Sequence, residues 1–429
     1  MNDPRSNPLD FKRQFRAWAM FDFANSLIYT NIVLYFPQWY TIRLGVNDFW
    51  YNALLTLSTF LLILTAPSLG MRSDQTGKRV GILRVTAVPM ILGTASLPLI
   101  TRAIPSLPIA VLIISLLFLV VNYSYQISLL FYDALLGDVA TEDRYLNASG
   151  VGFAVGWIGA LVGILAVLPF VRGSAAVMGF HGSEAAFIAG SILFCIVGGP
   201  CLFLLREPRQ TQDKALTEFQ TKPHSLRRLW TEVRNLRNQP RVFWFLIAYW
   251  FFIDAILTVQ ENLSIYLERV IGFDDSHKAL LALAGIIASV LGAFATAVFV
   301  KRKFAERSLR IVLATGSLCL VGTGLAPRAY IAVTVLLIAA FLFGSIWTLA
   351  RAIYTEMTPP GQRCEYFGFY SIAEKSSSVV GPILWGSTVS LLSGFGVIKY
   401  KTAMFLMAAL MLLGMAILSK ASSATRQTE

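Results

Sequence analysis

Apolar runs of roughly twenty residues recur along the whole chain, separated by polar stretches that are mostly short. About 20 consecutive apolar residues are enough for a helix to cross the hydrocarbon core of a bilayer. The pattern predicts about twelve membrane-spanning helices, at residues 17–40, 50–69, 80–101, 107–131, 147–170, 184–205, 241–267, 277–300, 309–326, 330–353, 366–392 and 398–419. We therefore expect an all-α integral membrane protein.

One long polar stretch, Arg206 to Gln239, divides these spans into two sets of six. We expect an N-terminal bundle at 1–205, a basic linker at 206–240 and a C-terminal bundle at 241–429. Within the linker, an apolar stripe opposes an arginine-rich face, which predicts an amphipathic helix. The stripe consists of Leu226, Leu229, Trp230, Val233 and Leu236, and the opposite face of Arg227, Arg228, Arg234 and Arg237. Such a helix is suited to an anionic leaflet, or to a solvated position against the bundle.

The composition agrees with a membrane protein and excludes several other classes. Of the 429 residues, 56% are hydrophobic and 14% are charged, against about 25% charged in a soluble protein. The net charge of +12 is not a sign of nucleic-acid binding, because most of the 36 Lys and Arg residues fall on one side of the predicted spans. Together with the even number of predicted spans, this asymmetry predicts that both termini are cytoplasmic.

The two predicted bundles resemble each other. Asp22 in the first span corresponds to Asp254 in the seventh, and the turn after the second span corresponds to the basic turn at Lys301 after the eighth. The segment from Phe131 to Asp138 at the end of the fourth span aligns with the segment from Arg351 to Glu356 at the end of the tenth. A duplicated six-helix unit is typical of secondary transporters, whose substrate site lies between the repeats.

The turn Gly70-x3-Asp74-x2-Gly77-Lys78-Arg79 and several further motifs point to a known family. These motifs are Trp18-x3-Asp22-Phe-Ala-Asn-Ser26, Phe131-Tyr-x-Ala-Leu-Leu-Gly-Asp138, Ser149-Gly-x-Gly152 with Gly156, and Arg351 followed by Glu365-Tyr-Phe-Gly-Phe-Tyr370 and Gly381-Pro382. Together they resemble the vacuole-effluxer (autophagy-related amino-acid permease) family of the major facilitator superfamily, including its bacterial branch. The chain departs from that family at Gln75, where an Arg is usual, and at Ala350, where a polar residue is usual.

This resemblance implies a secondary active transporter that works by alternating access. It implies export of amino acids or similar small polar solutes, and its bacterial branch implies an inner membrane of bacterial type. Protons are a candidate coupling ion because of the carboxylates of Asp254 and Glu374. Two alternatives remain open: a transport-inactive solute sensor or scaffold, and a carrier for sugars, peptides or drugs. We expect a monomer in the lipid bilayer that is not an enzyme and that binds no metal or cofactor, because the four Cys and three His residues lack metal-like spacing.

Polar side chains inside the spans are the candidates for binding substrate or protons, because such groups are costly in a bilayer and usually face the bundle interior. These candidates are Asn25, Tyr29, Asn122, Gln126, Asp254, Thr258, Glu261, Glu374 and Lys375. Asp22 shares a helix face with Asn25 and Tyr29, but it lies only about 8 Å along the first helix. We therefore assign Asp22 to a gate.

Asp254, Thr258 and Glu261 form a stripe at i, i+4 and i+7 on the seventh span. By helical rise, Asp254 and the Glu374–Lys375 pair lie roughly 14–18 Å from the cytoplasmic end, near the midplane. A buried carboxylate without a nearby cation suits proton binding and release, although Asp254 is equally placed for a structural hydrogen bond. Glu374 and Lys375 point about 100° apart on a helix and need not pair. Lys375 is a candidate for holding a substrate carboxylate, for pairing with Asp254, or for an ion pair that fixes packing.

Charged residues at the inner ends of the spans are the gating candidates. They are Asp22, Asp74, Lys78, Arg79, Asp133, Asp138 and Arg351. Asp133 and Arg351 occupy equivalent positions, so a pair between them would close the cytoplasmic mouth, unless both extend into the headgroups. We expect Asp74 to interact with Lys78 or Arg79, and Asp138 with Arg144.

Small residues follow two of the spans at intervals of three or four. Gly152, Gly156, Gly159 and Gly163 lie on the fifth span, and Gly285, Ala288, Gly292 and Ala295 on the eighth. Small residues let helix backbones approach closely. By the resemblance, these two helices pack across the halves, so we expect the pattern to form a rocking interface.

Overall fold

The structure is a computed structural model, which describes residues 8–46, 48–207, 236–237, 239–273, 275–377 and 380–425. Over these ranges the chain is almost entirely helical, apart from an isolated β-bridge between Val177 and Phe180. Most of the linker lies outside the described residues, including the expected amphipathic helix up to Val233.

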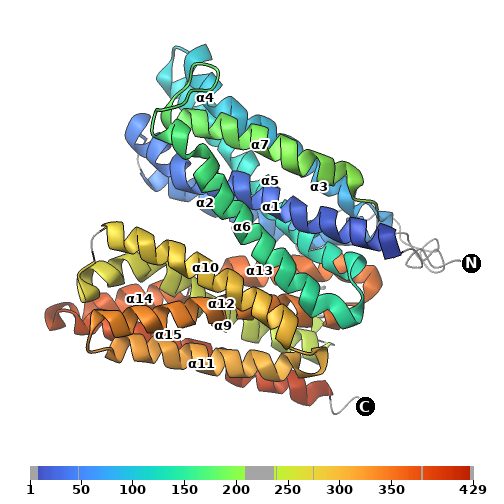
Figure 1. Ribbon diagram of the computed structural model, residues 1–429, viewed down its shortest axis with the longest axis vertical. Coiled ribbons are helices and arrows are strands. Elements are labelled where there is room, and N and C mark those ends of the chain that lie inside the picture. Colours follow the sequence, from blue (N-terminus) through green and yellow to red (C-terminus); the bar gives the residue numbers. More distant parts are fainter. Residues whose placement is uncertain are drawn as a thin grey trace, which may run out of the picture. The chain divides into compact units, whose positions relative to one another are not determined.

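The first six spans are formed by α1 to α7 (Figure 1). Their bounds are α1 Pro8–Gln38, α2 Asp48–Thr76, α3 Arg79–Val88, α4 Thr94–Ala103, α5 Leu107–Val139, α6 Tyr145–Val171 and α7 Gly182–Leu204. α3 and α4 form one span, joined by the π-helical turn Pro89–Gly93.

The last six spans are formed by α9 to α15. Their bounds are α9 Pro240–Tyr266 continued by the π-helical turn Leu267–Ile271, α10 Asp275–Phe299, α11 Ala305–Leu325, α12 Ala329–Met357, α13 Arg363–Ser377, α14 Val380–Leu391 and α15 Ile398–Thr425. Each of the twelve predicted spans therefore corresponds to one helix or to consecutive helices.

Ten helical stretches of the described residues are long and apolar enough to cross a membrane. α1 and the consecutive helices α13 and α14 are not among these ten. α1 carries Asp22 and Asn25, which lower the hydropathy of this span. α13 and α14 are described as separate helices of 15 and 12 residues, each too short to cross a bilayer alone. Polar residues in a span usually mark function, so Asp22 and Asn25 of α1 and Glu374 and Lys375 of α13 remain candidates.

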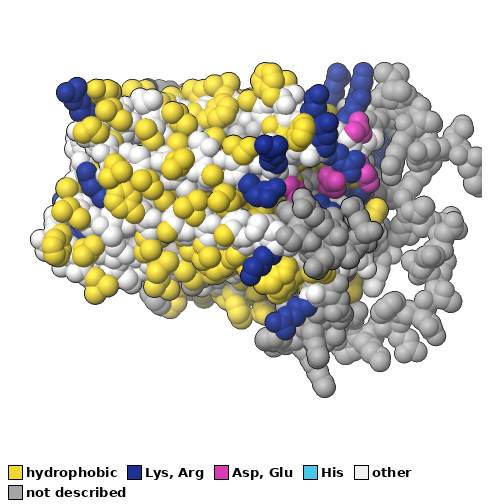
Figure 2. Space-filling model, turned by 90° about the horizontal axis from the view of Figure 1, so that it is seen from below, with side chains coloured by type: hydrophobic (Ala, Val, Ile, Leu, Met, Phe, Trp, Pro, Cys, Tyr) yellow, Lys and Arg dark blue, Asp and Glu magenta, His cyan; other side chains and the backbone are white. Residues whose placement is uncertain are grey.

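The surface is that of an integral membrane protein. Large apolar side chains such as Phe203, Phe299 and Leu391 are almost fully exposed, which in water would be unfavourable over so large an area. Figure 2 shows hydrophobic side chains across the face in view, with Lys and Arg toward its ends and the visible Asp and Glu toward one end. Lipid is the solvent that matches this distribution.

The chain folds into two compact units. Unit 1 comprises Met1–Ala140, Val155–His224 and Pro360–Gly368, and unit 2 comprises Thr141–Ala154, Ser225–Pro359 and Phe369–Glu429. α6 begins in unit 2 and continues in unit 1, whereas α13 begins in unit 1 and continues in unit 2. Two helices are thus shared between the units.

The glycines of α6 and α10 allow close helix packing inside each unit. In unit 1, a Cβ at Gly159 would lie 2.2 Å from the carbonyl oxygen of Phe23 in α1. In unit 2, a Cβ at Gly292 would lie 1.8 Å from the carbonyl oxygen of Phe341 in α12. Gly163 likewise faces α1. For Gly159, Gly163 and Gly292 the free face is used by a neighbour within the same unit, and the expected rocking interface between the halves stays a prediction. The start of α6 approaches α10 inside unit 2, where a Cβ at Gly150 would lie 2.6 Å from the carbonyl oxygen of Ala293.

Candidate functional site

The turn between α2 and α3 brings two gating candidates together in unit 1. α2 ends at Thr76 and α3 begins at Arg79. Gly77 has a φ of 68°, in the left-handed region that glycine adopts readily, and its N–H donates to the carbonyl oxygen of Ser73 at 2.8 Å. Helices commonly end in this way. Asp74 before the turn and Arg79 after it can therefore meet.

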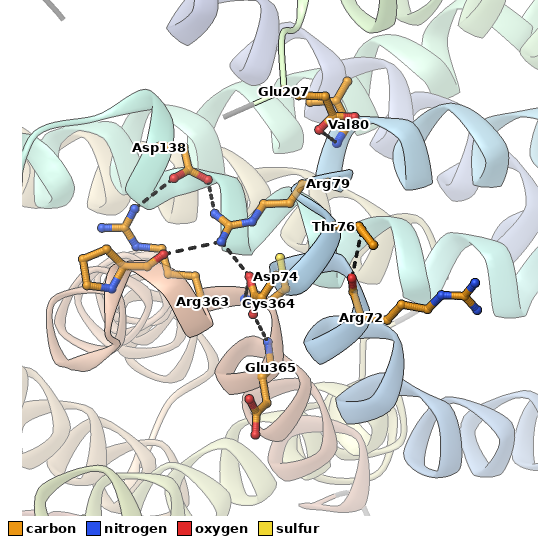
Figure 3. A network of polar contacts seen from close by, with 11 residues as sticks. Arg72, Asp74, Thr76, Arg79, Val80, Asp138, Glu207, Arg363, Cys364 and Glu365 are labelled. Carbon is orange, nitrogen blue, oxygen red and sulfur yellow. Dashed lines mark hydrogen bonds and ion pairs between the residues drawn. The ribbon is translucent and has the colours of Figure 1, made fainter. Parts of the chain in front are cut away.

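The guanidinium of Arg79 is the centre of a buried charge network (Figure 3). Its Nη2 donates to Asp74 Oδ1 at 2.6 Å, and its Nη1 donates to Asp138 Oδ2. Nη2 also lies 3.4 Å from the carbonyl oxygen of Pro360. The Arg79 and Asp74 side chains are only 6% and 5% exposed, so water weakens this pair little.

The same charges hold the first turn of α13, which also belongs to unit 1. Asp74 accepts hydrogen bonds from the backbone N–H groups of Cys364 and Glu365 at 3.2 and 2.9 Å. Arg363 Nη1 donates to Asp138 Oδ1 at 3.0 Å. A carboxylate is favourable at a helix N-terminus, where N–H groups lack partners and the helix dipole is positive. We call Asp74, Arg79, Asp138 and Arg363 the Arg79 network.

Two glycines make room for this contact. A Cβ at Gly70 of α2 would lie 2.4 Å from the carbonyl oxygen of Cys364, and a Cβ at Gly137 of α5 would lie 2.2 Å from Nε of Arg363. Both distances are far below van der Waals contact. The start of α13 therefore fits against α2 and α5 at the points where those helices carry no side chain.

Three of the predicted gating residues, Asp74, Arg79 and Asp138, thus lie in one network. The expected interaction of Asp74 with Arg79 is present. Lys78, the neighbour that was the other candidate partner, is exposed on the turn. Of the two basic residues in this turn, Arg79 is therefore the buried one and Lys78 the exposed one.

Arg363 was not predicted, although the sequence carried a signal for it. A basic residue at the start of a helix is unfavourable unless a carboxylate lies nearby, and Asp138 supplies that carboxylate. Asp138 was expected with Arg144, but it is held by Arg79 and Arg363. The Arg144 guanidinium lies 3.8 Å from its chain neighbour Asp143.

The remaining gating candidates are divided between the units. Arg351 in unit 2 is buried, and it donates to Ser149 through Nε at 3.0 Å and through Nη2 to the Ser149 carbonyl oxygen at 2.5 Å. Asp22 in unit 1 is buried beside Gly156. The pairing of Asp133 with Arg351 stays a prediction, since the first belongs to unit 1 and the second to unit 2.

Within unit 1, three predicted substrate-binding residues meet around Ser58. Tyr29 Oη donates to Asn122 Oδ1 at 3.1 Å, while Asn122 Nδ2 and Gln126 Nε2 donate to Ser58 Oγ at 2.5 and 3.0 Å. Asn25 makes a longer contact of 3.5 Å with a serine of α5. Gln126 Oε1 and Asn25 Nδ2 are buried without a hydrogen-bond partner among the described residues.

Asp254 in unit 2 is fully buried (0% exposed) and holds the start of α14. Its Oδ2 accepts a hydrogen bond from the N–H of Gly381 at 2.6 Å. A Cβ at Gly381 would lie 2.1 Å from Thr258 Oγ1, so the contact requires glycine. Asp254 Oδ1 and Thr258 Oγ1 have no hydrogen-bond partner among the described residues. Glu261, the third member of the predicted stripe, is exposed.

Glu374 and Lys375 form an ion pair with each other. Lys375 Nζ lies 3.0 Å from Glu374 Oε1, and Tyr249 Oη donates to Glu374 Oε2 at 3.1 Å. The two neighbours pair although they point about 100° apart on the helix, because both side chains are long enough to bend toward each other. The ring of Tyr249 stacks on the ring of Tyr370 with centroids 4.3 Å apart, so the hydroxyl that bonds Glu374 belongs to a packed aromatic pair.

The comparisons with known proteins agree with this architecture. A family model described as vacuole effluxer Atg22 like matches residues 50–428. The chain is 27% identical over 433 residues to an uncharacterized MFS-type transporter, YxiO, of Bacillus subtilis, covering 95% of each protein. It is 26% identical over 182 residues to autophagy-related protein 22-1 of Aspergillus niger, which covers 38% of this chain and 28% of that protein.

Solved structures of major facilitator superfamily transporters share the fold. A bacterial homologue of the iron transporter ferroportin, in an outward-facing state, matches with a TM-score of 0.73 at 15% identity, over 96% of this chain and 99% of that chain. The proton:xylose symporter XylE matches with a TM-score of 0.66 at 13% identity, over 96% of both chains. The predicted fold class is therefore confirmed.

Proposed function

Since this chain belongs to the vacuole effluxer Atg22-like family and is a transporter of the major facilitator superfamily, we propose that it exports a small polar solute by alternating access. Amino acids are the substrate class that we propose first. The description of the family as effluxers supports the direction. The protein is a membrane transporter and not an enzyme.

The observation that carries the proposal is the Arg79 network at the start of α13. Alternating access rocks one bundle against the other around a fixed site, so contacts at one mouth must form in one state and break in the other. α13 begins in unit 1, where Asp74 and Asp138 hold it, and continues in unit 2. A movement of unit 2 would therefore pull directly on these hydrogen bonds, which suits a gate.

Two polar clusters, one largely buried and one half-buried, are proposed to bind the solute. In unit 1, Tyr29, Asn122 and Gln126 offer uncharged donors and acceptors. In unit 2, Glu374 and Lys375 offer one charge of each sign. Neutral and charged groups of this kind match an amino acid better than a purely apolar solute, because every polar atom that enters needs a partner.

Proton coupling is proposed through Asp254 or Glu374. Asp254 is surrounded by the buried side chains of α9 and bonded to a backbone N–H, so water does not stabilise its charge. In proteoliposomes, flux that depends on pH in the native protein should lose that dependence in Asp254→Asn or Glu374→Gln. Flux that is independent of pH, and unchanged in both variants, would remove the coupling from the proposal.

The proposed setting is a cytoplasmic membrane with both termini on the cytoplasmic side. The excess of Lys and Arg in the loops on that side supports the orientation. The bacterial relative that covers 95% of the chain supports the type of membrane. The Arg79 network would then close the cytoplasmic mouth.

The deciding experiment is a flux screen in cells that lack the protein and in cells that express it. Labelled amino acids, sugars and peptides are loaded, and their exit is followed in the native protein and in Asp74→Asn. We expect faster exit of at least one amino acid, and a loss of this effect in the variant. Arg144→Gln, an exposed arginine outside the network, is the matched control. A sugar or peptide as the only transported solute would overturn the substrate class, and binding without flux would favour a sensor.

A further inference from the structure

α3 begins without a side-chain cap of its own. Lys78 precedes the helix, and its side chain makes no hydrogen bond to the first turn. The first N–H groups of a helix have no partner within the helix. Glu207, just after the end of α7, supplies acceptors for two of them. Its Oε2 accepts from the Val80 N–H at 2.8 Å (Figure 3), and its Oε1 accepts from the Gly81 N–H at 2.6 Å.

The backbone that carries Glu207 is itself held on two sides within unit 1. Arg84 of α3 donates to two carbonyl oxygens at the end of α7, at 3.0 and 3.1 Å. The side chain of Gln14 in α1 donates to the Leu204 carbonyl oxygen at 3.0 Å and accepts from the Arg206 N–H at 2.9 Å. Glu207 is thus a fixed acceptor for α3, although its side chain is exposed to solvent.

The residue next to this cap is the centre of the Arg79 network. Arg79 is the first residue of α3, directly before the two N–H groups that Glu207 accepts. Its guanidinium must reach Asp74 and Asp138 at the same time. Hydrogen bonds weaken steeply when the angle at the donor changes. A shift of the first turn of α3 would therefore weaken both ion pairs.

We infer that Glu207 is a positioning residue for the gate: its carboxylate fixes the first turn of α3, aims the Arg79 guanidinium at both carboxylates, and so determines how readily the start of α13 is released. This inference rests on the proposed role of the Arg79 network as a gate. Gly81 contributes by leaving space, since a Cβ there would lie 3.3 Å from Glu207 Oε1.

The reactivity of the Cys364 thiol reports whether the start of α13 has separated from the Arg79 network. It lies in the first turn of α13 between the two residues that contact Asp74 and Asp138, and it is fully buried. In a transport-competent protein with Cys364 as its single cysteine, a membrane-impermeant maleimide should react slowly. We expect Glu207→Ala to raise the labelling rate about fivefold, the size expected for loss of a helix N-cap. Glu207→Gln should give a smaller rise, because its amide oxygen still accepts a hydrogen bond without the charge.

Matched variants distinguish a specific effect of Glu207 on the Arg79 network from local unfolding of the surrounding segment. Glu142→Ala removes an exposed carboxylate of unit 2 and should leave the Cys364 rate unchanged. Cys201, buried in the last turn of α7, serves as a second single-cysteine reporter next to Glu207. We expect Glu207→Ala to leave Cys201 protected, because Arg84 and Gln14 still hold that segment. Equal exposure of Cys201 and Cys364 would show local unfolding and overturn the inference.

Asp74→Asn distinguishes failure of this inference from failure of the proposed gate. It should raise the Cys364 labelling rate on its own, because it removes the charge that Arg79 and the α13 N–H groups share. A rise with Asp74→Asn and none with Glu207→Ala would overturn the positioning role and leave the gate standing. No rise with either variant would overturn both.

Discussion

Two turns that the sequence predicts to be equivalent lie between α2 and α3 in unit 1 and between α10 and α11 in unit 2. Each carries an arginine that bonds a carboxylate near the end of another helix of its own unit, but the two arginines differ in solvent exposure. Arg79 bonds Asp138 near the end of α5, and Arg302 bonds Glu356 near the end of α12 at 3.0 Å. Arg302 also bonds Glu142 at 3.0 Å. The Arg302 side chain is 39% exposed, against 6% for Arg79.

The comparison shows that two ion pairs between the same kinds of residues can stabilise the fold by different amounts, depending on how far each pair is buried. An exposed pair is screened by water and salt, and typically stabilises a protein by about 0–1 kcal/mol. A buried pair that loses one partner leaves an uncompensated charge in a poor solvent, which costs about 3–5 kcal/mol. We therefore expect the turn of unit 1 to control the transport cycle more strongly than the turn of unit 2.

The largest effect is expected for Arg79→Ala. Asp74 would keep only backbone N–H partners from α13, and Asp138 would keep only Arg363. We expect the free energy of unfolding to fall by about 3–5 kcal/mol, seen as a lower thermal midpoint in detergent, together with loss of flux. A fall below 1 kcal/mol would show that the buried turn is no more important than the exposed one.

A smaller effect is expected for Arg363→Ala. This change removes one hydrogen bond to a charged group but leaves the bond between Arg79 and Asp138 in place. We expect a loss of about 1.5–3 kcal/mol and faster maleimide labelling of Cys364 than in the native protein. Unchanged labelling would show that the start of α13 is held by Asp74 alone.

The smallest effect is expected for Arg302→Ala, the counterpart of Arg79 in the repeat. Because the pair is exposed, we expect a change of no more than about 1 kcal/mol, which shrinks further as salt is added. Flux should stay close to that of the native protein. A loss of flux equal to that of Arg79→Ala would remove the asymmetry between the two turns.

Much of the fold could be predicted because its determinants are local. Twelve spans follow from runs of apolar residues whose length must match the bilayer. The first and eleventh spans were predicted despite residues such as Asp22 and Lys375, since their flanking apolar residues still reach the required length. Asp74, Arg79 and Asp138 were predicted as gating residues because a short motif and the repeat single them out.

The partners of those residues could not be predicted because they are far away in sequence or belong to the backbone. Asp74 is bonded to N–H groups some 290 positions later, and a backbone N–H has no signature in a sequence. Glu207 and Ser58 were missed for the same reason. They are ordinary polar residues until the fold places them beside an uncapped helix or a pair of amides.

The glycines show a pattern whose neighbours the sequence names only in part. Small residues at every third or fourth position predict close approach of two helices. They do not state which helix approaches. Gly159 approaches α1 and Gly292 approaches α12, two neighbours that the pattern did not name. The expected rocking interface between the halves stays a prediction.

The length of α5 has a consequence for the lipid in which the protein operates. Its 33 residues measure about 50 Å, roughly 20 Å more than the hydrocarbon core. The large side chains that it exposes, from Leu107 to Val120, lie in the half far from Asp138. Asp138 lies at the other end of the helix, so we expect it beyond the acyl chains, at the level of the headgroups. A thicker bilayer would draw this end of α5 toward the hydrocarbon core. Hydrophobic mismatch would therefore act on Asp138 and the Arg79 network, the same residues that we propose to form and break contacts during transport.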